Sequence, residues 1–311
     1  MKYIIGTRGS QLSLAQTNWV ISELKKQNSE NEYEIKTIKT KGDIDTRPLF
    51  SLEQKGIFEK EIDRAVAEKE VDFAVHSLKD VPSELADGLV LSSIPKREPI
   101  NDVFITNDDS TLETIKSGAV IGTSSLRRAV QISRLRDDVI VKPIRGNIES
   151  RIRKIKEGNY DGVVLAQAGI NRLGLDVKFS KLSVTDFPPS PGQGALGIVC
   201  RADDVETISM LKKIENSESR LEIEAERALS NFVESGCRFP VGAFAHVNEQ
   251  SLKLTVAAYS VDGKQALIVE KTGNKTNPLE LGKLAGEELQ KKGIKELALN
   301  WREKLDEWNK K

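Results

Sequence analysis

The chain has 311 residues, of which 38% are apolar and 30% charged, and its 47 basic residues equal its 47 acidic ones. This length is too great for one ordinary hydrophobic core and predicts two or three domains. Zero net charge argues against a general nucleic-acid or membrane-surface binder.

Short apolar runs alternate with helical patterns through the first two-thirds of the chain. We expect strands at 3–6, 71–78, 119–124, 139–144, 162–169 and 195–200, and helices at about 10–26, 58–69, 126–136 and 147–157. This alternation predicts parallel sheets with crossover helices. Proline-rich breaks at IPKREPIND (94–102) and FPPSPGQG (187–194) indicate two sheets rather than one.

The pattern changes in the last third of the chain. A helix at about 219–233 precedes strands at 241–247, 252–260 and 265–272, and two helices follow at about 278–291 and 294–309. Val261-Asp262-Gly263 is typical of a hairpin turn between the last two strands. We therefore expect a small α+β domain at 216–311, after a first domain at 1–97 and 195–215 and a second at 98–190.

The sequence shows no pattern typical of a secretory signal, a membrane span or a metal site. No apolar run approaches the ~20 residues of a membrane span, and the start, MKYIIGTRGS, becomes polar too soon for a secretory signal. With two cysteines, Cys200 and Cys237, we expect a cytoplasmic protein, although a bridge between them stays open. His76 and His246 stand in no cluster with metal-ligand spacing, so we expect no metal.

The charge is concentrated in one segment. Between Val120 and Leu175, eleven basic residues face five acidic ones, a local excess of +6, and eight of the eleven are arginines. Arginine binds carboxylate or phosphate through two parallel hydrogen bonds, which the lysine ammonium cannot do. The segment therefore favours recognition of an anion over mere solubility.

These arginines, together with Arg8, recur at one kind of position. Arg127 and Arg128 follow GTSSL, Arg145 opens RGNIESR, and Arg8 lies in GTRGS, each where a strand turns into a helix. Free N–H groups at helix starts and the carboxyl edge of open sheets both favour anions. The alternative is that Ser10, Ser124 and Ser125 only cap helices while the arginines form surface pairs. Four sites of one design favour a cleft for a small polyanion.

A lysine and an acid end the strand at 71–78. VDFAVHSLKDVPSE places Lys79 and Asp80 at the strand's exit, toward the same predicted cleft. An ionised acid there can stabilise a cationic intermediate or relay protons, although a loop ion pair of little energetic value is the alternative. His76 is interpreted as a hydrogen-bonded strand residue rather than a catalytic base.

With these residues assembled, the chain resembles the hydroxymethylbilane synthase (porphobilinogen deaminase) family. The resemblance covers nearly the whole length, through motifs that occur in family order: GTRGSQLSLAQ, TKGDIDTRPL, KGIFEKEID, VDFAVHSLKDVP, IGTSSLRRAVQ, IRGNIESRIRK, LAQAGINRLG, PGQGALGIVCR and SGCRFPVGAFA. So many motifs at compatible spacings make this a specific match.

The resemblance implies a fold and an activity. The fold is α/β, with two doubly wound domains like those of type II periplasmic binding proteins and a small C-terminal α+β domain with a three-stranded antiparallel sheet. The enzyme condenses four porphobilinogen molecules head to tail, releases ammonia each time and frees a linear tetrapyrrole by hydrolysis. A dipyrromethane primer is held as a thioether on a loop cysteine, which the motif places at Cys237. We expect a monomer without nucleic-acid or membrane partners.

The resemblance also assigns residues. Asp80 is the catalytic aspartate that holds pyrrole N–H groups, and Lys55 and Phe58 belong to a lid over the cleft. The residues that bind cofactor and substrate are Arg8, Ser10, Ser77, Lys79, Thr123, Ser125, Arg127, Arg128, Arg145, Arg151, Arg172 and Gln193. Each pyrrole carries two carboxylates, which explains why forked donors are preferred to point charges.

Some positions depart from the family pattern. Ser235 stands where a second glycine is common, Arg238-Phe239 replaces a more usual Gln-Val, and Ser51 occupies a lid position where a second lysine is common. These changes leave the predicted anchor intact but alter the loop's hinge and the lid's charge. Cys200, in the strand ALGIVC, is interpreted as a buried apolar residue.

Two other functions fit part of the pattern. A two-lobed protein that binds a small polyanion without catalysis, or a ligand-sensing regulator, would explain the arginines but gives Cys237 and the third domain no role. A transferase or hydrolase with Cys237 as nucleophile and His246 as base lacks an accompanying oxyanion motif.

Overall fold

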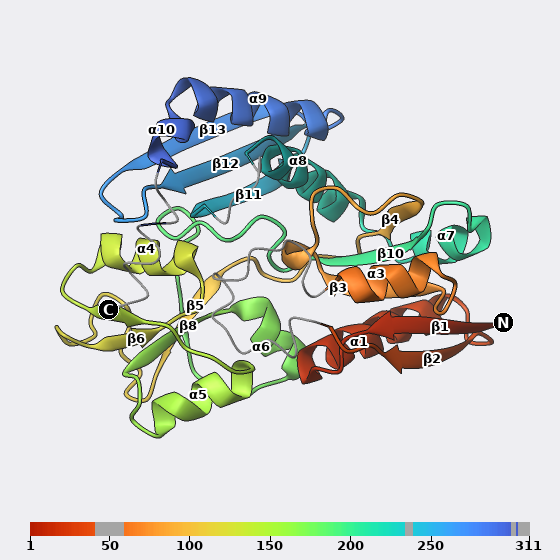
Figure 1. Cartoon of the computed structure of the whole chain (residues 1–311), viewed down its shortest axis with the longest axis horizontal. Coiled ribbons are helices and arrows are strands. Elements are labelled where there is room, and N and C mark those ends of the chain that lie inside the picture. The colour runs from red at the N-terminus through yellow and green to blue at the C-terminus, as the bar shows by residue number, and fades with distance from the viewer. Residues whose placement is uncertain (41–58, 234–238, 300–302, 304–311) are drawn as a thin grey trace.

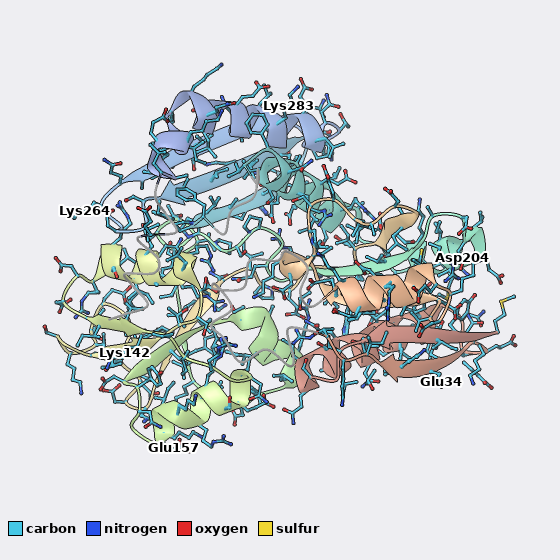
Figure 2. All side chains as sticks on the ribbon, viewed as in Figure 1. Glu34, Lys142, Glu157, Asp204, Lys264 and Lys283 are labelled. Atoms are coloured by element: carbon cyan, nitrogen blue, oxygen red, sulfur yellow. The ribbon has the colours of Figure 1, made fainter. Side chains whose placement is uncertain are left out.

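The computed structural model describes residues 1–40, 59–233, 239–299 and 303 of the chain. Three sheets organise these residues, two of five strands and one of three (Figure 1). The three-stranded sheet lies above the two larger sheet units in the view of Figure 1. Charged side chains such as Glu157, Asp204 and Lys264 lie at the outer margins of these units (Figure 2).

The first sheet has the strand order β2-β1-β3-β10-β4. Its strands are β1 (Lys2–Thr7), β2 (Glu32–Thr37), β3 (Phe73–Ser77), β4 (Leu89–Ser93) and β10 (Leu196–Arg201), and its helices are α1 (Gln11–Gln27), α3 (Lys60–Ala67) and α7 (Val205–Lys212). β1 is parallel to β2 and β3, as expected for crossover helices, while β10 is antiparallel to β3 and β4. Tyr3, Ile5 and Phe73 pack in its core with Ile198.

The second sheet repeats this order as β7-β6-β8-β5-β9. Its strands are β5 (Asp102–Thr106), β6 (Val120–Gly122), β7 (Ile140–Lys142), β8 (Gly162–Ala166) and β9 (Ser180–Lys181), and its helices are α4 (Leu126–Leu135), α5 (Ile148–Lys156) and α6 (Gln167–Leu173). Here β5 is the strand that runs antiparallel to its neighbours, β8 and β9. In each sheet the antiparallel strand follows a crossover from the other sheet, which confirms the expected pair of type II binding-protein-like lobes.

Two expectations for these lobes were wrong. The sheets are mixed rather than parallel, because β5 and β10 enter from the neighbouring lobe and run against the strands that crossover helices connect. The run at 162–169 is a strand only as far as Ala166, and its last three residues begin α6. A short apolar run with small residues suits a buried strand and a buried helix equally, so its pattern could not separate them.

The third unit matches its predicted strands closely. β11 (Val241–Asn248), β12 (Ser251–Tyr259) and β13 (Ala266–Asn274) form an antiparallel meander. The helices α8 (Ser217–Val233) and α9 (Pro278–Lys291) pack on this sheet, followed by α10 (Ile294–Leu297). We expect a final helix at about 294–309. α10 spans Ile294–Leu297, and apart from Glu303 the positions beyond 299 lie outside the described ranges, so that part of the helix stays a prediction.

Two crossover segments, 94–101 and 187–195, connect the lobes and also contact the third unit. Arg97 forms a bidentate ion pair with Glu226 of α8, with N–O distances of 2.7 and 2.9 Å. Glu226 is fully buried, and it also accepts hydrogen bonds from the backbone N–H groups of Gly192 (2.7 Å) and Ala245 (2.8 Å). One carboxylate therefore ties both crossovers to the third unit. The predicted domain boundaries themselves stay a prediction.

Candidate active site

The carboxyl edges of the two larger sheets meet where α1 and α6 begin. α1 follows β1 in the first sheet and α6 follows β8 in the second, and the two helices pack together near Leu12 and Gly169 (Figure 1). The carboxyl ends of parallel strands, with their free helix N–H groups, are where open α/β sheets bind ligands. The predicted basic residues that follow strands at these two edges are Arg8, Lys79, Arg127, Arg128 and Arg145, whereas Arg151 lies within α5 and Arg172 in the last turn of α6.

Lys79 and Asp80 lie directly after β3, in the 3₁₀ turn Leu78–Asp80 (η2), and both side chains are exposed. Because β1 is parallel to β3, Arg8 follows its strand at the same edge. Gly192 of the second crossover packs directly on this turn, since a Cβ at Gly192 would lie 2.9 Å from the backbone nitrogen of Lys79. The crossover thus fixes the backbone that carries the lysine and the acid.

Water reaches the side chain of Lys79, yet its ammonium is poorly hydrated. Burial of this group lowers its pKa to about 8, with Asp80 opposing the shift and Arg128 adding to it. A cation with a lowered pKa, beside an exposed carboxylate, suits an anionic ligand that also carries a cationic or N–H group.

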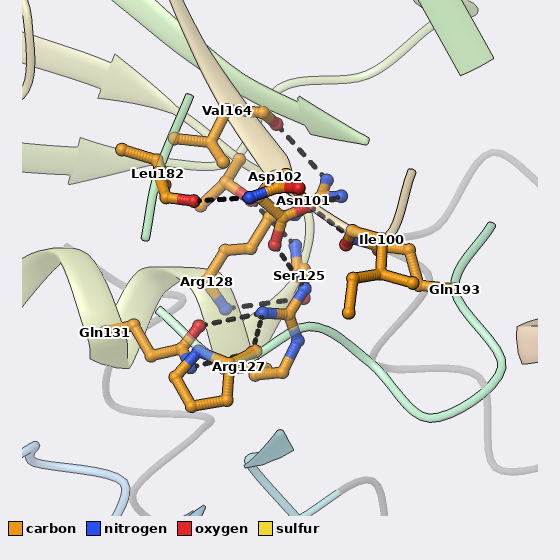
Figure 3. Close-up of polar contacts among 12 residues, drawn as sticks. Ile100, Asn101, Asp102, Ser125, Arg127, Arg128, Gln131, Val164, Leu182 and Gln193 are labelled. Atoms are coloured by element: carbon orange, nitrogen blue, oxygen red, sulfur yellow. Dashed lines mark hydrogen bonds and ion pairs between the residues drawn. The ribbon is translucent and has the colours of Figure 1, made fainter. Parts of the chain in front are cut away.

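Arg127 and Arg128, on the first turn of α4, converge on the buried carboxylate of Asp102 (Figure 3). The Nη2 of Arg127 lies 2.7 Å from Oδ2, and the Nη2 and Nε of Arg128 lie 2.6 and 3.1 Å from Oδ1. Asp102 is 1% exposed and both arginines are 7% exposed. The two arginines are therefore not the surface pairs of the alternative reading, and one of their two charges is balanced inside the protein.

Asp102 was missed by the reasoning from sequence. Burial alone would raise its pKa, but the charges of Arg128 and Arg127 outweigh burial and hold the pKa well below its usual value. The carboxylate is therefore ionised, and it fixes the planes of both guanidinium groups. The sequence PINDVFIT places Asp102 between a proline break and an apolar strand. An acid in that position is ordinarily interpreted as a solvated loop residue, so its buried role was not predicted.

Three other predicted arginines make few contacts with acids in the described part of the chain. The Nη2 of Arg145 is buried without a hydrogen-bond partner among the described residues. Arg151 and Arg172 donate to the carbonyl oxygens of Gly146 (2.8 Å) and Gly194 (2.7 Å). Burial lowers the pKa of each to about 10, and for Arg151 the charges of Arg128 and Arg145 add to the effect. These guanidinium groups retain donors for a ligand.

The predicted hydroxyl donors have local partners. Ser10 and Ser125 are the N-caps of α1 and α4, accepting from the backbone N–H groups of Ser13 (3.2 Å) and Arg128 (3.4 Å). Thr123 is fully buried and accepts from the N–H of Ser125, while Ser77 bonds to the amide of Gln16. Capping, which the alternative reading proposed for serines here, is thus observed at Ser10 and Ser125.

Gln193, on the second crossover, is fully buried. Its Nε2 donates to the carbonyl oxygen of Ile100 (2.8 Å) and to Oδ1 of Asp102 (2.9 Å). The amide thus joins the crossovers and helps to orient the carboxylate that holds Arg127 and Arg128. Its Nε2 is occupied by these two contacts.

Other singled-out residues separate into two groups. Cys237, Lys55 and Phe58 lie outside the described residues, as do Ser51, Ser235 and Arg238. His76 is buried with its Nε2 3.1 Å from Oδ1 of Asp63, which confirms a hydrogen-bonded strand histidine. Cys200 is fully buried, and burial raises the pKa of its thiol to about 11, which confirms the interpretation as an unreactive apolar residue.

Within the described ranges, no helix is both long and apolar enough to cross a membrane. No group of three or more His, Cys, Asp or Glu side chains is arranged to hold a metal ion in these ranges either. The polar groups that converge at the two sheet edges are instead arginine, lysine and amide donors with one exposed acid, Asp80.

Comparisons with known proteins give family matches over both parts of the chain. Residues 3–209 match the family model of the porphobilinogen deaminase dipyrromethane cofactor binding domain, and residues 220–291 match the C-terminal domain of the same family. A probable porphobilinogen deaminase of Nitrosopumilus maritimus is 72% identical over the full length of both chains. The porphobilinogen deaminase of Brevibacillus brevis is 45% identical over 94% of this chain and 95% of that protein.

Solved structures that resemble the chain are more distant. A Salmonella typhimurium periplasmic binding protein with high arginine specificity is 13% identical, with a TM-score of 0.39 over 68% of this chain and 91% of that one. The methionine-binding protein MetQ is 11% identical, with a TM-score of 0.41 over 68% and 88% of the two chains. The family matches over both parts of the chain, together with relatives of equal length, are decisive: the chain belongs to the porphobilinogen deaminase family, transferases of tetrapyrrole biosynthesis that carry a dipyrromethane cofactor.

Proposed function

We propose that the chain acts as hydroxymethylbilane synthase with the residues described above as its site. It condenses four porphobilinogen molecules head to tail on a dipyrromethane primer, releases ammonia at each step and frees the linear tetrapyrrole by hydrolysis. The observation that carries the assignment of the site is the exposed Lys79–Asp80 pair on η2, at the sheet edge that faces the arginines of the second lobe.

The donor set fits the primer and the substrate. Each pyrrole of both carries two carboxylates, so a growing chain is a polyanion. The buried, unpartnered Nη2 of Arg145 supplies an unused donor, and Arg151 and Arg172 bond only to carbonyl oxygens within the described residues. These arginines and Lys79 would hold carboxylates, while Asp102 neutralises part of the charge at Arg127 and Arg128.

Asp80 is the residue that faces the reacting atoms. Its exposed carboxylate accepts hydrogen bonds from pyrrole N–H groups and stabilises the positive charge that develops on the substrate as ammonia leaves. Lys79, the next residue along the turn, binds a carboxylate of the same substrate and so orients it against Asp80. The primer, when bound, would supply the free pyrrole carbon that attacks the first incoming unit, and each added unit then carries the carbon that attacks the next.

The remaining roles rest on motif positions. Cys237 anchors the primer as a thioether, which requires a free thiol and therefore a reducing compartment, so we place the reaction in the cytoplasm. Lys55 and Phe58 close over the substrate. Because every proposed site residue comes from one chain, we propose that the monomer is the active form.

We expect Arg145→Lys to raise the KM for porphobilinogen roughly tenfold, although the charge is kept. A lysine cannot replace the fork that presents the Nη2, which has no hydrogen-bond partner among the described residues, and one hydrogen bond to a charged group is worth about 1.5 to 3 kcal/mol. Steady-state kinetics against Lys142→Arg, the reverse change at an exposed position of the same lobe, provide the check. Wild-type constants for Arg145→Lys would refute the role of the fork.

The affinity for substrate should fall as the pH rises through about 8. Lys79 is cationic below its pKa of about 8, so its attraction for a carboxylate is present below this pH and lost above it. In Lys79→Arg the charge persists at high pH, so this part of the KM profile should disappear. KM profiles from pH 6.5 to 9.5 for the two proteins test the idea, and identical profiles would show that Lys79 does not contact the substrate.

A further inference from the structure

A side chain of the third unit reaches the arginines of the second lobe through one amide. We propose that Gln131 and Tyr259 are positioning residues that hold Arg127 in its substrate-binding orientation only when the third unit is docked on α4. This inference deepens the proposed function and depends on it, because it takes Arg127 to bind a carboxylate of the substrate. No contact of either residue with the substrate is needed.

The contacts form a continuous chain. The Nη1 of Arg127 donates to Oε1 of Gln131 at 2.8 Å, and Nε2 of Gln131 donates to Oη of Tyr259 at 3.3 Å. Nη1 of Arg127 and Nε2 of Gln131 also share the carbonyl oxygen of Pro188 as acceptor, at 2.7 and 3.0 Å. Figure 3 shows the amide of Gln131 beside the guanidinium of Arg127, on the side away from Asp102.

The partners determine which way the amide of Gln131 points. Arg127 has only hydrogen-bond donors, so the Oε1 of Gln131 must face it. The carbonyl of Pro188 is an acceptor, so the Nε2 of Gln131 must face that oxygen. Gln131 is fully buried, and Tyr259 is 5% exposed, with burial raising the pKa of its hydroxyl. Because unpaired polar groups are costly at such depth, the network has one satisfied arrangement.

Tyr259 is held by the docking of its sheet on α4. Leu126 and Val130 of α4 pack against Ala257 and Tyr259 of β12. Arg134 lies over the ring of Tyr259, 5.6 Å from its centre, and donates to the carbonyl oxygen of Gly263 at 2.6 Å. The position of the third unit therefore decides whether the hydroxyl is available to Gln131.

The network completes the surroundings of Arg127. Asp102 holds Nη2, Gln131 and Pro188 hold Nη1, and the ring of Phe187 lies 5.9 Å from the guanidinium carbon. Without Gln131 the guanidinium keeps its charge, Asp102 and the carbonyl of Pro188, but its Nη1 loses one of two acceptors and with it part of the restraint on its orientation. The third unit, which the family motif makes the carrier of Cys237, thus influences a substrate-binding arginine of another lobe.

The first test measures the guanidinium itself. In ¹⁵N-labelled protein the Nη hydrogens of Arg127, assigned by their loss in Arg127→Lys, should exchange with water slowly in the parent and at least tenfold faster in Gln131→Leu. Tyr160→Phe removes a tyrosine hydroxyl bonded to the carbonyl of Pro143 elsewhere in the lobe and should leave the rate unchanged. An unchanged rate in Gln131→Leu would overturn the proposal without any reference to turnover.

The second test is a double-mutant cycle on the KM for porphobilinogen. Gln131→Leu should raise KM roughly tenfold, since it removes a hydrogen bond to a charged group, and Tyr259→Phe should raise it two- to threefold, each with kcat within twofold. Since Tyr259 acts through Gln131, Tyr259→Phe should add nothing in the Gln131→Leu background. Additive effects would show a merely structural role and overturn the relay. If the parent protein neither binds nor converts porphobilinogen, the proposed function itself fails instead.

Discussion

An Asp80→Asn variant should fold and carry its primer, yet turn over porphobilinogen 10² to 10⁴ times more slowly, the range typical for loss of a positioned acid–base or charge-stabilising group. The amide keeps the size of the carboxylate and one acceptor oxygen, but it cannot balance the positive charge that develops as ammonia leaves. Because Asp80 is exposed at the end of η2, the substitution leaves the core intact.

Asp87→Asn is the matched control. Asp87 is an exposed acid seven residues further along the same connection, and its loss should leave turnover within twofold. Single-turnover measurements on both variants separate the chemical step from product release. Turnover at the parent rate in Asp80→Asn would remove Asp80 from the mechanism.

Asp102→Ala should lower the free energy of unfolding by about 3 to 5 kcal/mol, because it leaves two buried arginine side chains without their negatively charged partner. The carboxylate is 1% exposed and bonds to Arg127, Arg128 and Gln193, so one substitution removes the acceptor for three groups. The effect is present at neutral pH, because Arg128 and Arg127 hold the pKa of Asp102 well below its usual value and the group is ionised.

A surface acid provides the comparison for Asp102. Asp109 pairs with Lys178 at 2.7 Å, but both side chains are more than half exposed, so Asp109→Asn should cost less than about 1 kcal/mol. Calorimetric unfolding of both variants and the parent tests the difference. If the two variants are equally stable, the buried carboxylate does not organise the arginine pair.

Local patterns predicted the parts of the fold that depend on short-range order. The strands β11, β12 and β13 and the hairpin turn between the last two appear within about two residues of their expected bounds. Alternation and turn residues determine such meanders locally. The direction of β5 and β10 could not be predicted in the same way, because it depends on which lobe each crossover enters.

In the candidate site, too, only the features that depend on neighbours in the sequence could be predicted. The positions of Arg127, Arg145 and Lys79 at strand ends followed from their neighbours in sequence, as did the caps Ser10 and Ser125. Their partners did not, because Asp102 reaches Arg127 across 25 positions and Gln131 reaches Tyr259 across 128. Hydrophobic periodicity predicts that a residue is buried, but the partner of a buried polar group is decided by tertiary packing.

The central claim is that Cys237 carries a covalent primer, and the intact mass of the purified protein tests it most directly. The parent and a Cys200→Ala variant should each be heavier than their sequence by two deaminated porphobilinogen units, since the Cys200 thiol is buried and its pKa is about 11. Cys237→Ala should have its unmodified mass. An unmodified parent that still gains no mass after incubation with porphobilinogen would contradict the account and favour a protein that binds polyanions without catalysis.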